Sequence, residues 1–191
     1  MFVNSTLFGQ YTSSRNIDQF AGDIEKNIFR LTFMAYDDIG FPFTFSYERE
    51  IKRPFTFVMK AGPSFDISKF GPSDDPYQYS MNAFASAELR YYYNLKRRIR
   101  KAKTVRNFSG IYLALEQSVL SGPIIVINQS RTHATERSSG TFTNIGYQKQ
   151  FKQSYFNAFL GAKINVSDLK EGILSADTYH IGIALGVVLF E

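Results

Sequence analysis

The sequence predicts an all-β fold, an eight-stranded antiparallel up-and-down transmembrane β-barrel. From residue 28 onward, apolar and polar residues alternate in segments of about ten residues, as they do in strands with one apolar face. The chain has 19 Phe and 12 Tyr among 191 residues, and such rings favour strands and membrane interfaces. No apolar run approaches the roughly 18 to 20 residues of a spanning helix, so a helical membrane protein is excluded.

The first four predicted strands each carry an apolar set at every second position. The segment 28–35 alternates Phe, Leu, Phe and Ala with Arg and Thr, and 41–49 alternates three Phe and a Tyr with Thr, Ser and Glu. A short turn leads to 55–62, which has two Phe, a Met and an Ala, so these two strands form a hairpin. The segment 81–95 alternates three Ala, a Leu and two Tyr with polar residues and Phe.

The second four follow the same rule. The segment 110–116 sets Ile and two Leu against Gly, Tyr, Ala and Glu, while 141–149 is the weakest, with one Ile and one Tyr. The segment 156–164 sets Phe, Ala, Leu, Ala and Ile against Asn, Phe, Gly and Lys. The last, 179–189, has six apolar or aromatic residues at alternate positions. An even number of strands returns both termini of the chain to the periplasmic side of the membrane.

The breaks between segments alternate in length, as in outer-membrane barrels with short periplasmic turns and long external loops. They are short after the second and sixth strands. They are long at Asp66 to Ser80, Ser118 to Gly140 and Asn165 to Thr178, the predicted external loops. The short connection from Tyr36 to Gly40 and the long basic one after the fourth strand are exceptions.

Charged residues occupy the polar face near the strand middles, in a nearly balanced set: Arg30, Glu48, Lys60, Glu88, Arg90, Glu116 and Lys163. In a soluble lipocalin-like barrel they would face water, and the apolar set would line an interior that binds an apolar ligand. The apolar rows, however, have aromatic residues towards their ends, like a lipid-facing band with girdles. We therefore predict that the charges are enclosed as a paired structural network rather than a proton or ion path.

The last strand resembles the signal that the outer-membrane assembly machinery reads. His180, Gly182, Leu185 and Val187 fit it, although the family usually ends on an aromatic residue and this chain ends Phe190-Glu191. The segment from Glu88 to Asn94, the basic run after it and the segment from Phe108 to Glu116 resemble the small bacterial outer-membrane β-barrel proteins of the PorT-like type. The resemblance covers residues 28–191. It implies a bacterial outer-membrane location, insertion by that machinery and contact with outer-membrane lipids, but no activity.

The chain divides into three parts on this interpretation. Residues 1–10 are apolar and then small, like the tail of an export signal, although a basic n-region is missing. We predict a remnant of a signal peptide at 1–10, an N-terminal periplasmic segment at 11–27 and the barrel domain at 28–191. A disordered soluble N-terminus is the alternative for the first segment.

A basic run lies between the fourth and fifth predicted strands: Lys96, Arg97, Arg98, Arg100, Lys101, Lys103 and Arg106. On this topology it is a periplasmic turn that contacts anionic head groups or an acidic partner, or is simply solvated. The run holds no stacking aromatic pattern, and we expect no nucleic-acid binding despite a formal charge of +5.

No catalytic, metal or cofactor site is predicted. The chain lacks cysteine, and His133 and His180 are far apart, outside any ligand-spaced cluster. His133 has Ser and acidic neighbours in a polar loop, which keeps an outer-membrane lipid hydrolase as one alternative. The leading hypothesis is a non-enzymatic outer-membrane protein whose external loops or basic turn bind an envelope protein or another molecule. A soluble lipocalin-like carrier is the other alternative.

Overall fold

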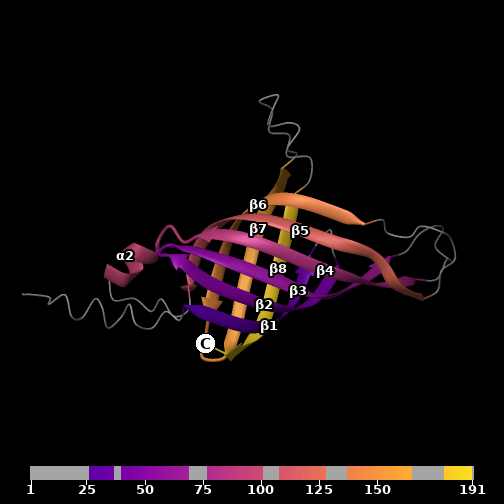
Figure 1. The fold of residues 1–191 in the computed structure, drawn as a ribbon, viewed down its shortest axis with the longest axis horizontal. Helices are drawn as coiled ribbons and strands as arrows, with labels where there is room; N and C mark the ends of the chain where they lie inside the picture. Colours follow the sequence, from indigo (N-terminus) through magenta and orange to yellow (C-terminus); the bar gives the residue numbers. More distant parts are fainter. Residues whose placement is uncertain are drawn as a thin grey trace, which may run out of the picture.

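The computed structural model describes residues 26–36, 40–68, 77–100, 108–127, 137–164 and 179–190. Eight strands enclose a single barrel, and a short helix lies at one end of it (Figure 1). Their bounds are β1 Asn27–Tyr36, β2 Phe41–Lys52, β3 Phe55–Ser68, β4 Gln78–Tyr91, α2 Leu95–Arg100, β5 Gly110–Ile127, β6 Ser138–Gln150, β7 Ser154–Ile164 and β8 Tyr179–Phe190. Among these residues, no helix is long and apolar enough to cross a membrane.

The barrel is closed, and every strand pairs antiparallel with its neighbours in sequence. β1 completes the circle by pairing with both β2 and β8, so that Phe33 lies opposite Phe43 on one side and Leu185 on the other. The predicted eight-stranded antiparallel up-and-down barrel is thus confirmed. Closure leaves no long sheet edge unpaired, which is how barrels avoid edge-to-edge aggregation.

The two ends of the barrel differ. We call one the turn end. It holds the tight turn between β2 and β3, the helix α2, the short connection between β6 and β7, the beginning of β1 and the end of β8. The opposite end, the loop end, holds the connections after β1, β3, β5 and β7. At the loop end Gly40 has φ +83°, a left-handed backbone that favours glycine, and it bridges back to Tyr36.

Three predicted boundaries are wrong. The fourth strand does not run to Leu95 but ends at Tyr91, because the chain turns there and Leu95 begins α2. β3 and β5 both run past their predicted ends, to Ser68 and Ile127, so much of the predicted loop Ser118 to Gly140 is strand. The pairing of β4 with β5 is irregular around Asn82, and β5 loses its alternation after Leu120, so the sequence pattern did not reveal the full length of β5.

Candidate functional site

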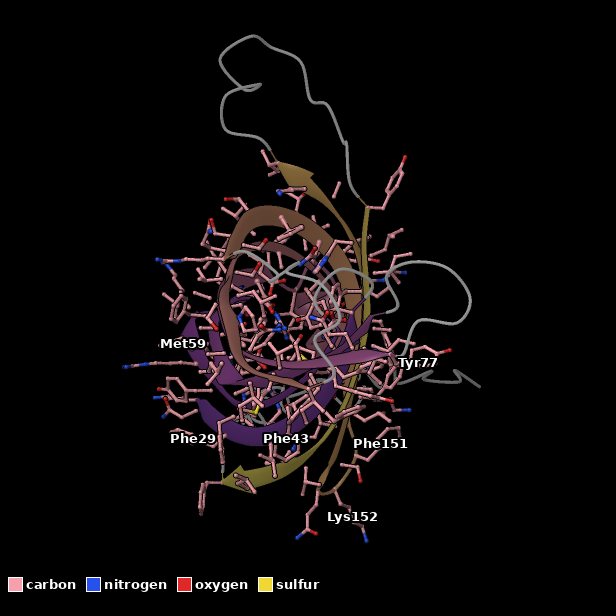
Figure 2. All side chains as sticks on the ribbon, turned by 90° about the vertical axis from the view of Figure 1, so that its right-hand side faces the viewer. Phe29, Phe43, Met59, Tyr77, Phe151 and Lys152 are labelled. Atoms are coloured by element: carbon pink, nitrogen blue, oxygen red, sulfur yellow. The ribbon has the colours of Figure 1, made fainter. Side chains whose placement is uncertain are left out.

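The outer surface of the barrel is apolar. Phe29, Phe43 and Met59 point away from the barrel axis (Figure 2). Along the strand middles Leu113 is 50% exposed and Ile183 is 52% exposed, whereas Glu88 and Arg90 are 2% and 1% exposed. In the strand middles, the apolar alternate positions therefore point outward and the charged ones point inward, the reverse of a soluble barrel with an apolar interior.

Outward aromatic side chains gather near both ends of the strands. At the turn end, the rings of Phe29 and Tyr47 lie 4.7 Å apart between centroids, and those of Phe55 and Tyr91 lie 5.0 Å apart. Exposed aromatic residues nearer the loop end are Phe33, Phe41, Phe65, Tyr77, Tyr79 and Tyr179. Exposed aliphatic residues lie between these two groups: Met59, Leu89, Leu113, Leu115, Ile145, Leu160, Ile183 and Leu185.

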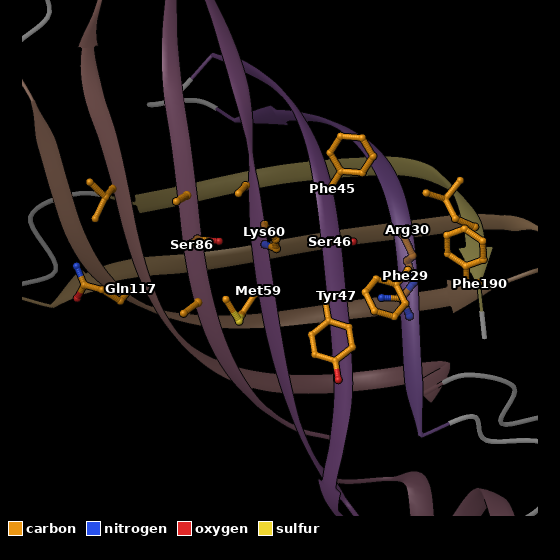
Figure 3. A pocket seen from close by; sticks show the side chains of 15 residues that line it. Phe29, Arg30, Phe45, Ser46, Tyr47, Met59, Lys60, Ser86, Gln117 and Phe190 are labelled. Atoms are coloured by element: carbon orange, nitrogen blue, oxygen red, sulfur yellow. The ribbon is translucent and has the colours of Figure 1, made fainter.

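A shallow furrow crosses this outer surface from the end of β8 over β1 to β5 (Figure 3). Phe45, Tyr47 and Met59 stand along it, and the small side chains of Ala61 and Ala85 leave it open in the middle. The furrow lies between two rows of outward side chains, and the polar side chains of Lys60 and Ser86 behind it point into the barrel (Figure 3). It therefore offers an apolar surface with little to orient a polar ligand.

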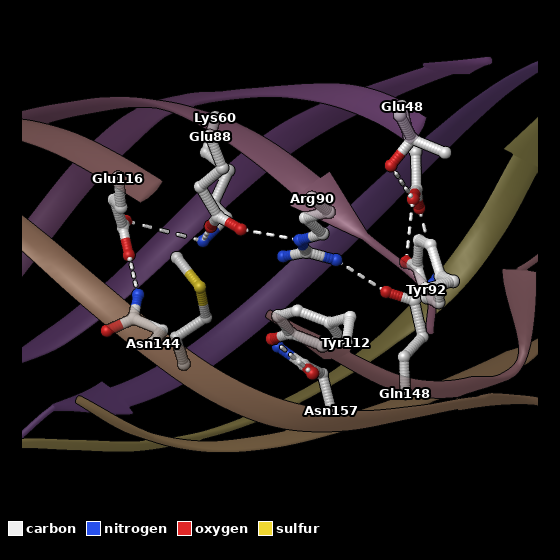
Figure 4. A network of polar contacts seen from close by, with 12 residues as sticks. Glu48, Lys60, Glu88, Arg90, Tyr92, Tyr112, Glu116, Asn144, Gln148 and Asn157 are labelled. Carbon is white, nitrogen blue, oxygen red and sulfur yellow. Dashed lines mark hydrogen bonds and ion pairs between the residues drawn. The ribbon is translucent and has the colours of Figure 1, made fainter. Parts of the chain in front are cut away.

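The interior holds a connected ionic network (Figure 4), and Glu48 is one of its centres. Its Oε2 is 2.8 Å from Nη1 of Arg30, and it also accepts a hydrogen bond of 3.0 Å from Nε2 of Gln148. Its Oε1 accepts hydrogen bonds from the hydroxyls of Thr56, at 2.9 Å, and Tyr92, at 2.8 Å. A buried carboxylate needs such multiple donors, because each unmet lone pair would leave charge unsolvated.

Arg90 joins this centre to a second one at Glu88. Its Nε lies 2.5 Å from Oε2 of Glu88, and its Nη1 donates to Oε1 of Gln148 at 2.5 Å. Lys60 forms an ion pair with Glu88 and lies 3.6 Å from Oε1 of Glu116. The network therefore contains three cations and three carboxylates, which is the balance that a water-poor interior requires.

Aromatic and amide groups complete the network. The guanidinium of Arg30 lies 4.4 Å from the ring centroid of Tyr155, and that of Arg90 lies 4.4 Å from that of Tyr112. Burial raises the pKa of Tyr92, one residue past the end of β4, well above its usual value, and the Glu48 carboxylate raises it further. The Tyr92 hydroxyl therefore stays protonated and remains a donor to Glu48.

Apolar clusters fill the interior on both sides of the network. The turn-end plug consists of Ile28, Tyr92, Leu95, Phe108, Tyr112 and Ala114, all buried. Leu95 brings the start of α2 into it, and Phe108 contributes its ring from a left-handed backbone with φ 61°. Such a backbone costs a non-glycine residue about 1–3 kcal/mol, which the complete burial of the ring offsets.

The loop-end plug is aromatic. It consists of Met34, Tyr36, Phe84, Leu120, Tyr155, Phe159 and Ala184, and Phe142 and His180 pack with it. The His180 ring lies 4.3 Å from that of Phe142 and 5.0 Å from that of Tyr36. Gly182 is needed beside it, because a Cβ there would meet the Phe159 ring. With plugs at both ends, side chains fill the barrel.

Of the residues predicted to form the interior network, six are buried and joined as described, whereas Lys163 is half-buried near the loop end, opposite Phe142. The sequence did not predict four neutral members: Gln148, Tyr92, Tyr112 and Asn157, whose Oδ1 accepts a hydrogen bond of 2.9 Å from the Tyr112 hydroxyl. All four lie at inward positions of the alternation, but they carry no formal charge that would distinguish them from residues that only fill the barrel. Among the described residues, no cluster of acidic or histidine side chains could hold a metal ion.

The predicted basic turn is in part a helix, since α2 covers Lys96 to Arg100; Arg97 is exposed and Arg98 half-buried. Lys101, Lys103, Arg106 and His133 lie outside the described residues. In the predicted assembly signal, His180 is buried and its neighbour Gly182 faces the interior with it. Leu185, Val187 and Phe190 are exposed on the outer surface, at 56%, 51% and 68%.

Comparisons with protein-family models, curated proteins and solved structures find no match for this chain.

Proposed function

We propose that the protein is a small integral barrel of the bacterial outer membrane, of the PorT-like type and without enzymatic activity. Its role would be binding or accessory, through the external loops or the basic segment at the turn end. One observation carries the proposal: apolar side chains cover the outside of the barrel, and paired charges lie in the middle of its inside. Among the described residues, 31 large apolar or aromatic side chains are exposed, far more than a water-soluble surface tolerates.

The height of the apolar surface agrees with a bilayer. On β8 the outward residues run from Tyr179 to Leu189, which is ten residue steps. At about 3.3 Å per residue this is roughly 33 Å along the strand, and a tilt of about 40° reduces it to roughly 25 Å. Transmembrane barrels carry an outward apolar band of about 25 Å between aromatic girdles, as this surface does. The furrow of Figure 3 would then be filled by acyl chains.

The filled interior favours a role at the ends of the barrel rather than transport through it. An eight-stranded barrel is just wide enough for its side chains, and the two plugs and the network occupy this one. The lipocalin-like alternative would need an apolar cavity where Arg30, Glu88 and Arg90 lie. Chemistry at His133 would belong to the lipid-hydrolase alternative, which no described contact favours.

Membrane integration is tested by producing the chain in a Gram-negative host and extracting the membranes with alkaline carbonate. We expect the protein to stay in the pellet, to dissolve only with detergent, and to migrate faster on a gel before boiling than after it. Urea-denatured protein should regain the faster form when phosphatidylcholine vesicles are added and not in buffer alone. A folded monomer in buffer without detergent would refute the proposal and favour the soluble carrier.

A further inference from the structure

Exposed cations surround the turn end of the barrel. Lys26 precedes β1, Arg49 and Lys52 end β2, Arg97 lies in α2, and Lys149 and Lys152 lie at the end of β6 and in the connection to β7. We call these six residues the turn-end cations: Lys26, Arg49, Lys52, Arg97, Lys149 and Lys152. They come from connections all around the barrel and not from one side of it.

Negative charge is scarce at this end. Among the described residues there, Glu50 is the one acidic side chain outside the interior network, and it lies 3.3 Å from Nε of Arg53, which neutralises it. The described part of the loop end, by contrast, carries Asp66, Arg137 and Lys163. Within the described part of the chain, the larger excess of positive charge therefore lies at the turn end.

The cations lie just beyond the outward aromatic residues. Arg49 follows Tyr47 on the outward face of β2, and Lys149 follows Tyr147 on that of β6. Nζ of Lys149 lies 4.7 Å from the centroid of the Phe151 ring, which holds the lysine at the level of the aromatic residues. In a membrane barrel this is the depth of the lipid head groups.

We propose that the turn-end cations bind the phosphate groups of anionic phospholipids in the leaflet that surrounds this end. This inference rests on the proposed function, because it needs the barrel to span a bilayer. A lipid leaflet is favoured over an acidic protein because the cations encircle the barrel, as its surrounding lipids do. A protein partner docks on one patch and would leave the cations on the far side unused. Each cation close to an anionic surface contributes on the order of a fivefold change in affinity at low salt.

The test uses the full chain inserted in phosphatidylcholine vesicles that contain a trace of spin-labelled phosphatidylglycerol or spin-labelled phosphatidylcholine. The motionally restricted fraction of each label gives its relative affinity for the barrel. We expect the barrel to prefer phosphatidylglycerol, and we expect this preference to fall severalfold in the double variant K149Q/K152Q. It should also fall in 1 M salt, where the Debye length is only about 3 Å and charge interactions are screened. The matched control R137Q/K163Q removes the same charge at the loop end, and the preference should change much less.

The outcomes separate the two proposals. Insertion into phosphatidylcholine without any preference for phosphatidylglycerol would overturn the lipid site and leave the membrane barrel intact. An equal loss in both double variants would also overturn it, because the preference would then follow net charge and not the turn end. A third outcome would assign the cations to an acidic protein instead. In that case soluble polyglutamate would bind the detergent-solubilised barrel and not the K149Q/K152Q variant, and the barrel would show no preference between the two lipids. Failure to insert would overturn both proposals.

Discussion

Replacing Ile183 by arginine tests the outward face of the barrel at its middle. Ile183 is 52% exposed on β8 and lies opposite Ala158 of β7 and Ala35 of β1, so an arginine there displaces no packed side chain. Six residue steps separate it from Leu189 at the turn end, and four separate it from Tyr179 at the loop end. With about 3.3 Å per step and a tilt near 40°, these distances are roughly 15 Å and 10 Å along the barrel axis.

For a barrel in a bilayer, this depth is close to the midplane. Arginine on the lipid face costs about 2–4 kcal/mol there and about 0–1 kcal/mol near the interfaces. We expect Ile183→Arg to lower the equilibrium constant for folding into vesicles by about 30-fold to 1000-fold. Leu189→Arg, the same type of change on the same strand and face, should lower it by less than about fivefold.

The assay is reversible folding into phosphatidylcholine vesicles over a urea series, followed by the gel-mobility difference between folded and unfolded forms. Comparing two positions on one strand removes general effects of the added charge. If both variants fold as well as the original chain, or lose the same stability, depth in the bilayer has no influence and the lipid-facing assignment is refuted. A soluble barrel predicts that outcome, because arginine at either exposed site would remain in water.

Three further predictions concern the interior. Glu88→Gln should destabilise the folded barrel by about 3–5 kcal/mol in the same urea series, because Lys60 and Arg90 lose their shared carboxylate. K60M/E88L should recover part of that loss, because it removes one of the two unpaired cations, and equal instability of the two variants would contradict the pairing of Lys60 with Glu88. Gly182→Ala should lower the free energy of unfolding by about 1–3 kcal/mol, because the new Cβ meets the Phe159 ring. Adding Phe159→Leu should reduce this loss, whereas unchanged stability in the single variant would show that the ring has room to move. Planar bilayers that contain the purified barrel should show no steady single-channel conductance, because the two plugs close the interior, and regular channel steps would contradict this account.

The strand order and the facing of side chains could be predicted from the sequence because both follow from a period of two. If the register of a strand shifted by one residue, its whole outward apolar set would turn inward, as with Phe29 in β1, Leu113 in β5 or Ile183 in β8. The alternation along a whole strand therefore determines which face each of its residues takes. The ends of strands could not be predicted in the same way. β5 continues through Gly122 and Pro123 past irregular pairing at Asn82, and local composition there is typical of a loop.

The members of the interior network could be predicted in part. The sequence predicts six charged members, because they carry formal charge and occupy the alternate positions that face inward: Arg30, Glu48, Lys60, Glu88, Arg90 and Glu116. The neutral members were missed because a tyrosine or glutamine on the inward face is equally compatible with plain filling of the barrel. Only the three-dimensional register brings Gln148 of β6 within reach of Glu48 on β2, a hundred residues away in the chain. Similarly, Gly182 fits a sequence signal for assembly, yet in the structure it also makes room for Phe159.

The charged residues inside the barrel and those at its turn end have different roles: the first stabilise the fold, and the second are available for binding. Inside, three cations meet three carboxylates, so the charges of the network balance within the barrel and leave no net charge for a ligand. At the turn end, six exposed cations stand near a single carboxylate, itself paired with Arg53, so the described residues leave a clear excess of positive charge there. Because charge that is unmet within a fold is available for recognition, the turn end is where binding is most readily expected.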